Sequence, residues 1–190
     1  MTSDSIPPIR RSISVSWDQE TAFKRFTQEF ASWWPSRTHS ICGERLKRVV
    51  FETHAGGQIY EEHEDGRRFL WGQITEWNPP GRVKFTWHPS RDPSTAQDVE
   101  LEFMVEEGGT RLQLTSSRWE RWGKGAQRAR RGYDVGWGYV LNVWAGRRTV
   151  GMSLMDGLVS LMNLKMKLRG GREAEIARAG GQISPASQGG

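Results

Sequence analysis

The residues that could carry acid–base, nucleophilic or metal chemistry are few in this 190-residue sequence, and they are scattered. No two of the four histidines are three or four residues apart, so no pair would share one face of a helix. The chain has no second cysteine for a thiolate metal site, no Gly-x-Ser-x-Gly nucleophile motif, no phosphate loop and no dinucleotide fingerprint. We therefore assign no catalytic residue, no metal ligand and no cofactor. The histidines are His39, His54, His63 and His88.

The densest group of ionisable residues is the run 61–64, Glu-Glu-His-Glu, which precedes Asp65-Gly66. Neighbouring residues on a strand point to opposite faces, and Asp-Gly is a strong signal for a tight hairpin turn. We interpret the run as the solvated tip of a hairpin and not as a metal site. His63 and His88 could face the mouth of a pocket and orient a polar group of a ligand, although structural histidines are more common.

The single cysteine, Cys42, excludes an intramolecular disulfide, which suits a reducing compartment. It lies in a connector with no basic partner nearby in sequence, so a buried, unreactive thiol is the expectation. The sequence shows neither a signal peptide nor an apolar stretch long enough to span a bilayer. These features predict a cytoplasmic protein without a membrane span.

The chain carries a net charge of +5, with a pI of about 9.7 and a mean hydropathy of −0.67. The basic residues are concentrated in the range 118–131, and the acidic ones in the range 61–65. Basic runs are most often solvated faces, so we do not predict nucleic-acid binding. Ten tryptophans compensate for the modest apolar content by their large buriable area.

Seven stretches alternate apolar and polar residues with the period of two that half-buried strands show. The last six are joined by short turns, and so predict an antiparallel meander. The stretches are Ile9–Trp17, Arg48–Thr53, Gln58–Glu64, Arg68–Trp77, Arg82–His88, Val99–Val105 and Arg111–Thr115.

Two helices are predicted, one on each side of the meander. The first begins at the N-cap Asp18 and ends at or before Trp34, because Pro35 follows. The second spans about 126–147 and has one bulky apolar face, formed by Tyr133, Trp137, Val140, Leu141 and Trp144. The order predicts an α+β domain in which a curved sheet wraps around the C-terminal helix and leaves a cavity between them.

Glycines at 132, 136 and 138 interrupt that second helix. Because glycine is unfavourable in a helix interior, we interpret them as positions where the sheet, a ligand or the following segment approaches closely.

Six motifs in order resemble the activator of heat-shock protein 90 ATPase homologue group of the START-like superfamily. The resemblance covers about residues 9–146 and implies a helix-grip fold with an apolar pocket between the sheet and the last helix. It also implies ligands such as lipids, sterols and polyketides, and a chaperone partner for the eukaryotic namesake. The motifs are Trp33-Trp34-Pro35, Gly56-Gly57, Asp65-Gly66 with Trp71-Gly72, Trp77-Asn78-Pro79-Pro80, Phe85-Thr86-Trp87 and Gly136-Trp137-Gly138-Tyr139-Val140-Leu141-Asn142.

The side chains that would line such a pocket follow from strand and helix parity. If Phe85 and Trp87 point inward, Trp71 shares a face with Gln73 unless a bulge at Gly72 resets the alternation. The alternative for each residue is ordinary core packing. The predicted lining residues are Trp34, Trp71, Phe85, Trp87, Phe103, Tyr133, Trp137 and Val140.

Both ends of the chain lie outside the predicted domain, 9–147. Residues 1–8 and 170–190 have the composition of disordered segments. Residues 150–169 are apolar on more than one face and predict an extra helix. That helix could dock on its own domain, form a homodimer, or lie on a membrane surface.

Three functions remain open from the sequence. The first is a module that binds an apolar or aromatic small molecule, and the second is a co-chaperone or other protein-interaction module. The third is a cyclase- or hydrolase-type enzyme, which would need an acid and a base converging inside the cavity. The first is favoured because the predicted pocket is aromatic and no acid–base pair is evident.

Overall fold

The computed structural model describes residues 6–147 and 182–183. The predicted segment 150–169 lies outside the described residues, as do residues 1–5 and most of 170–190. In chain order the elements are β1 (Ile9–Val15), α1 (Gln19–Thr27), α2 (Phe30–Trp33), η1 (Gly43–Arg45), β2 (Leu46–Phe51), β3 (Gln58–His63), β4 (Arg68–Asn78), β5 (Arg82–Trp87), η2 (Pro93–Thr95), β6 (Gln97–Glu106), β7 (Gly109–Ser117), η3 (Trp119–Trp122), α3 (Ala126–Trp144) and β8 (Gln182–Ile183), where η marks a short 3-10 helix.

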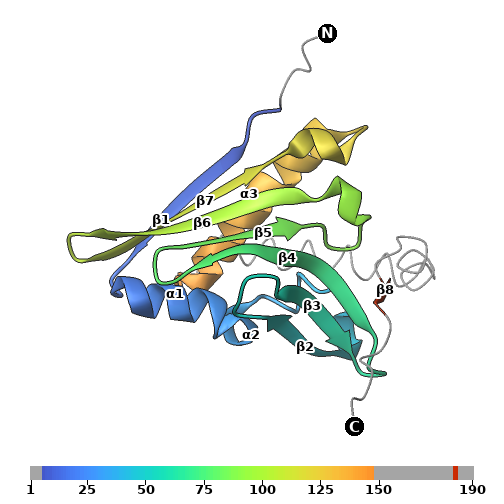
Figure 1. The fold of residues 1–190 in the computed structure, drawn as a ribbon, viewed down its shortest axis with the longest axis horizontal. Helices are drawn as coiled ribbons and strands as arrows, with labels where there is room; N and C mark the ends of the chain where they lie inside the picture. Colours follow the sequence, from blue (N-terminus) through green and yellow to red (C-terminus); the bar gives the residue numbers. More distant parts are fainter. Residues whose placement is uncertain (1–5, 148–181, 184–190) are drawn as a thin grey trace.

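The strands form one antiparallel sheet in the order β1-β7-β6-β5-β4-β3-β2, and the two-residue β8 pairs with the start of β4. The sheet curves around α3, while α1 and α2 close one end (Figure 1). This confirms the predicted α+β, helix-grip architecture and all seven predicted strands. Within the described residues, no helix is both long and apolar enough to cross a membrane.

The inner face of the sheet follows the predicted parity, with one reset. On β5, Phe85 and Trp87 are buried with Val83, as alternation requires. On β4, Trp71 and Ile74 are both buried although they are three residues apart. The pairing of β3 with β4 shifts register here and leaves Trp71 between the paired residues Leu70 and Gly72, so a bulge is present one residue before the predicted position. It moves Gln73 to the outer, exposed face.

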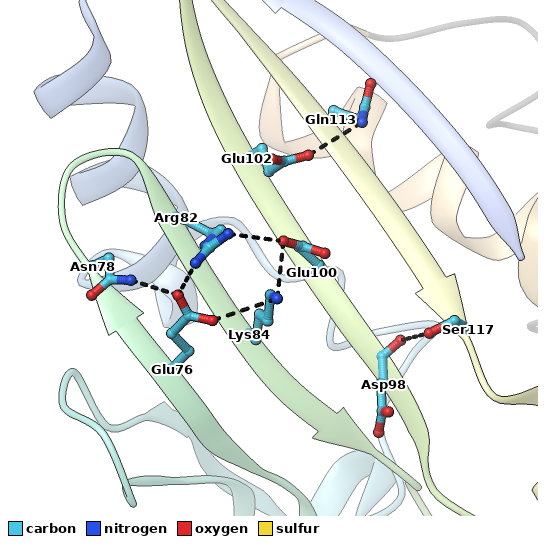
Figure 2. A network of polar contacts seen from close by, with 9 residues as sticks. All are labelled: Glu76, Asn78, Arg82, Lys84, Asp98, Glu100, Glu102, Gln113 and Ser117. Atoms are coloured by element: carbon cyan, nitrogen blue, oxygen red, sulfur yellow. Dashed lines mark hydrogen bonds and ion pairs between the residues drawn. The ribbon is translucent and has the colours of Figure 1, made fainter.

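The outer face of the sheet is covered by charged side chains. Lys84 lies between Glu76 and Glu100, with its Nζ 3.5 Å and 3.3 Å from their carboxylate oxygens (Figure 2). Arg82 contacts the same two carboxylates from the same strand. These partly exposed pairs contribute little stability, but they mark this face as solvated. A site for an apolar ligand therefore belongs on the opposite face, toward α3.

The first predicted helix begins as expected but is broken in two. Asp18 caps it, since its Oδ1 accepts the backbone N–H of Thr21 at 2.7 Å. The prediction of one continuous helix to Trp34 was wrong, because α1 ends at Thr27 and α2 starts at Phe30. The hydroxyl of Thr27 donates to the carbonyl of Phe23 at 2.8 Å, a back-bond that bends helices.

Candidate ligand-binding cavity

A cavity of about 680 Å³ lies between the inner face of β4 and β5, the helix α3, and the connector that follows α2. Its volume is in the range of small-molecule sites in proteins. The lining residues are Trp34, Thr38, His39, Ser40, Ile41, Trp71, Trp87, Pro89, Ser90, Trp122, Ala129, Gly132, Tyr133, Gly136, Trp137 and Val140.

The floor of the cavity is a cluster of buried indoles, Trp34, Trp71, Trp87 and Trp137. The ring of Trp71 lies 5.1 Å from that of Trp34 and 5.4 Å from that of Trp87. Trp137 on α3 lies 5.4 Å from Trp87, so the helix and the sheet meet through aromatic contact. Tilted and edge-on contacts at these distances are the favoured arrangements of aromatic pairs, and they make the floor a rigid apolar surface.

We define the mouth of the cavity by five lining residues that are partly or fully exposed: Pro89, Ser90, Trp122, Ala129 and Gly132. They come from the turn after β5, from η3 and from the first half of α3. The cavity therefore runs from open solvent at this mouth to the indole floor.

Six of the eight predicted lining residues do line the cavity, and Phe85 and Phe103 do not. Phe85 packs against Phe51 at 5.8 Å, deeper along β5. Phe103 packs against Phe23 at 5.2 Å and Trp144 at 6.3 Å, at the far end of α3. Parity predicted their inward direction correctly, but position along the strand decides between cavity and core. For both residues the prediction of a cavity position was wrong.

The two predicted orienting histidines are also placed elsewhere. His63 lies at the end of β3, with its Nδ1 2.9 Å from Asp65 Oδ1. His88 is buried beside the cavity but does not line it, and burial lowers the pKa of its imidazole. The histidine that does line the cavity is His39, whose ring stacks on Tyr139 at 5.1 Å.

Glu61 corrects the interpretation of the acidic run as a solvated tip. Its side chain is fully buried, and Oε2 accepts the backbone N–H groups of Ile41 at 2.9 Å and Cys42 at 2.8 Å. Ser40 Oγ donates to the same oxygen at 3.1 Å. Burial raises the pKa of this carboxyl in spite of the hydrogen bonds that it accepts. Because Ser40 and Ile41 line the cavity, the hydrogen bonds they donate to Glu61 hold one cavity wall in place.

The other acidic residues of the run behave differently. Glu62 is also buried, and its carboxylate contacts Lys47 Nζ and Arg48 Nη2, each at 2.6 Å. These hydrogen bonds hold its pKa below the ordinary value. Only Glu64 and Asp65 are exposed, as expected for a hairpin tip.

The thiol of Cys42 is half-buried and adjoins the Glu61 carboxylate. Loss of solvation, followed by the charge of Glu61, raises the pKa of Cys42 far above its ordinary value. Since the thiolate is the nucleophilic form, this cysteine is not activated for catalysis.

Sequence reasoning missed the contributions of the connector 38–41 and of η3. Trp119 is fully buried, and its Nε1 donates to the carbonyl of Ser116 at 3.0 Å. That anchor places Trp122, three residues later, at the cavity mouth beside Tyr133, with 5.6 Å between the ring centroids. The i, i+3 spacing of two tryptophans in a basic loop was the available signal. Nothing in the connector predicts that a buried carboxylate holds it.

Two of the three glycines in α3 leave open space on the cavity side. A methyl group added at Gly132 or Gly136 would meet no other atom within 4 Å, and both residues line the cavity. Gly138 does not line it, and an added methyl would be 3.9 Å from the Arg11 guanidinium carbon. Among the described residues, the glycines therefore enlarge the cavity and do not admit a neighbouring backbone.

The described part of the chain contains no group of three His, Cys, Asp or Glu residues placed to hold a metal ion. Three buried indole N–H groups have no hydrogen-bond partner among the described residues, and those of Trp71 and Trp137 belong to lining residues. An unpaired buried donor costs about 1–3 kcal/mol. The third belongs to Trp144, in the core.

Comparison with known proteins identifies the family. The family model described as Activator of Hsp90 ATPase homolog 1-like protein matches residues 17–143. The chain belongs to this family. The match covers the fold from the first helix through almost all of α3, and so includes every cavity-lining residue. None of the curated proteins compared with the chain matches it.

Several solved structures resemble this family member. The self-sacrificing resistance protein CalC from Micromonospora echinospora is 28% identical, with a TM-score of 0.57 over 74% of this chain and 92% of that one. A Mesorhizobium loti protein is 17% identical, with a TM-score of 0.53 over 73% of this chain and 94% of that one, which supports the fold alone. Txn09, described as an anthrahydroquino-gamma-pyrone synthase, is 33% identical over 68% of this chain and 88% of that one, with a TM-score of 0.48.

Proposed function

We propose that this protein binds an apolar, aromatic small molecule in the cavity between the sheet and α3. The observation that carries the proposal is a cavity of about 680 Å³ with an indole floor and a solvent-exposed mouth. Burial of apolar surface contributes roughly 25 cal/mol per Å² before the costs of association and ordering. A planar aromatic ligand gains most, because it can contact several indole rings at once.

The structure also favours ligand binding over simple core formation. Glycine in a helix interior costs about 1 kcal/mol relative to alanine, and Gly132 and Gly136 both lie where a side chain would occupy the cavity. A helix that served only to close a core would gain stability from larger residues here.

The family description supports a second candidate, a co-chaperone or other protein-interaction module. Such a function requires an outer surface and no internal cavity, which is why we place it second. The description of CalC as a resistance protein suggests a narrower form of the first proposal, in which handling the bound molecule confers resistance.

A melting-temperature screen of the full chain tests the proposal. The panel should contain flavonoids, aromatic polyketides and fatty acids, with polar sugars of similar size as controls. We expect at least one aromatic class to raise the Tm in a dose-dependent manner, because a ligand that binds only the folded state stabilises it. No stabilisation by any apolar compound, together with a stable complex with a chaperone in pull-down experiments, would favour the second candidate.

A further inference from the structure

Arg91 stacks on a residue of the cavity mouth and has no ion-pair partner among the described residues. The guanidinium carbon of Arg91 lies 3.8 Å from the ring centroid of Trp122, a mouth residue. Arg91 Nε contacts Thr95 Oγ1 at 3.3 Å, and the backbone N–H of Arg91 closes a turn on the carbonyl of His88 at 2.9 Å. The backbone turn and the hydrogen bond from the guanidinium Nε thus hold the side chain, while its charge is balanced by no described carboxylate.

The neighbouring charges are arranged differently. Arg121 Nη1 is paired with Asp98 at 2.9 Å, and Arg118 Nε lies 3.7 Å from the same carboxylate. Asp92, next to Arg91 in sequence, accepts the backbone N–H of Ser94 at 2.8 Å and forms no ion pair with Arg91. Arg91 forms no such ion pair among the described residues. It does not line the cavity itself, but it contacts Trp122 at the mouth.

A hydrogen-bond donor lies beside this cation. Tyr133 lines the cavity, and its ring packs edge-on against Trp119 at 5.2 Å and Trp122 at 5.6 Å. Its hydroxyl has no hydrogen-bond partner among the described residues, and it is not one of the fully buried unpaired polar atoms. Arg91 and Tyr133 both contact the ring of Trp122, which places them on the same part of the mouth. Burial raises the pKa of Tyr133 to about 12, and the charge of Arg91 acts in the opposite direction, so the phenol is protonated at neutral pH.

We propose that Arg91 and the Tyr133 hydroxyl form an anion-recognition site at the cavity mouth, so that the ligand is an aromatic acid: a planar apolar body with a carboxylate, phenolate or sulfonate at one end. This inference rests on the proposed function and specifies its ligand. The indole floor takes the apolar body, and the guanidinium and the phenol take the charged oxygens. Stacking on Trp122 fixes the guanidinium before binding, so less side-chain freedom is lost when the anion arrives.

Two fluorescent probes that share one ring system separate this inference from the proposed function. The first, 1-anilinonaphthalene-8-sulfonate, carries a sulfonate, and the second, N-phenyl-1-naphthylamine, is the same molecule without it. Both should be titrated into the full wild-type chain and into the variants Arg91→Gln, Tyr133→Phe and Arg131→Gln. Arg131 is exposed on α3 and, in contrast to Arg91, does not stack on Trp122, so its variant controls for the loss of one positive charge.

We expect Arg91→Gln to weaken binding of the sulfonate probe by about tenfold, the typical effect of losing one charge-assisted contact at a partly exposed site. Tyr133→Phe should weaken it by about three- to tenfold for the loss of a neutral donor. In both variants any change in affinity for the neutral probe should be smaller than the change for the sulfonate probe, because the neutral probe carries no charged oxygen for either group to bind. Arg131→Gln should change neither affinity. If both probes bind but Arg91→Gln leaves the sulfonate affinity unchanged, the anion site is overturned and the proposed function stands. If neither probe binds the wild-type chain, the proposed function fails as well.

Discussion

Glu61 and Glu62 are adjacent on β3 and are held in opposite electrostatic conditions. Glu61 is enclosed under the connector that lines the cavity, where burial raises its pKa. Glu62 faces the other side of the strand, where Lys47 and Arg48 lower its pKa. Each carboxyl therefore links folding to pH, and the two links have opposite signs.

For Glu61, the folded protein binds the proton more tightly than the unfolded chain does, because the pKa in the folded state lies above the ordinary value of 4.5. The free energy of unfolding should fall as pH rises from about 4.5 through the folded-state pKa. The variant Glu61→Gln has no carboxyl at this position, so it lacks this pH-dependent contribution to the free energy of unfolding. Urea unfolding at a series of pH values should therefore show wild type losing stability relative to Glu61→Gln as pH rises.

Glu62→Gln is the matched control. The pKa of Glu62 is depressed in the folded state, so its stabilisation is present above about 4.5 and is lost as pH falls through the folded value. Wild type should lose stability relative to Glu62→Gln on acidification, the reverse of the Glu61 result. If the stability difference from wild type changed with pH in the same direction for both variants, burial would not be what sets the pKa of Glu61.

At the scale of elements, the bulge in β4 lies where β4 and β5 approach closely and where Trp71 enters the cavity floor. Gly72 follows Trp71, and β5 passes so close that a Cβ at Gly72 would lie 1.7 Å from the carbonyl oxygen of Thr86. This approach lets Trp71 and Trp87 meet edge-on at 5.4 Å. The floor therefore depends on a backbone contact that only glycine permits.

Gly72→Ala should destabilise the fold by about 2–3 kcal/mol, because the two strands must separate to admit the methyl group. Gly132→Ala is the same substitution at a helical site, where the added methyl group would meet no atom within 4 Å. It should stabilise the protein by up to about 1 kcal/mol, because alanine favours the helix. Chemical denaturation of both variants measures the difference. A Gly72→Ala protein as stable as wild type would show that the strands are not in close contact there.

Hydrophobic periodicity predicted the strands, the long helix and the inward direction of the aromatic side chains. Those properties depend on residues close in sequence, such as Tyr133 and Trp137 on one helical face. Periodicity does not show where along a strand the cavity ends and the core begins. Phe85 and Phe103 were therefore wrongly predicted to line the cavity. The hydrogen bonds from Ile41 and Cys42 to Glu61 join segments about twenty residues apart, so no local sequence pattern could predict them.

At the scale of the whole molecule, the curved sheet, the broken first helix and α3 together leave a cavity that no single element defines. The connector after α2 forms one wall, the turn after β5 and η3 form the mouth, and α3 carries the glycines that keep the space open. All of the cavity-lining residues lie within residues 17–143, which match the activator-of-Hsp90-ATPase-homologue family. The central claim is that the cavity holds an aromatic molecule.

The most direct test of that claim is to fill the cavity from α3 and measure binding of the neutral probe N-phenyl-1-naphthylamine. Gly136→Phe places a ring in the cavity, whereas Gly138→Phe adds the same ring on the same helix at a residue that does not line it. We predict saturable one-to-one binding to wild type and to Gly138→Phe, and binding weaker by about tenfold or more to Gly136→Phe. Circular dichroism should show both variants folded. Equal binding by the two variants, or no saturable binding by wild type, would contradict the account.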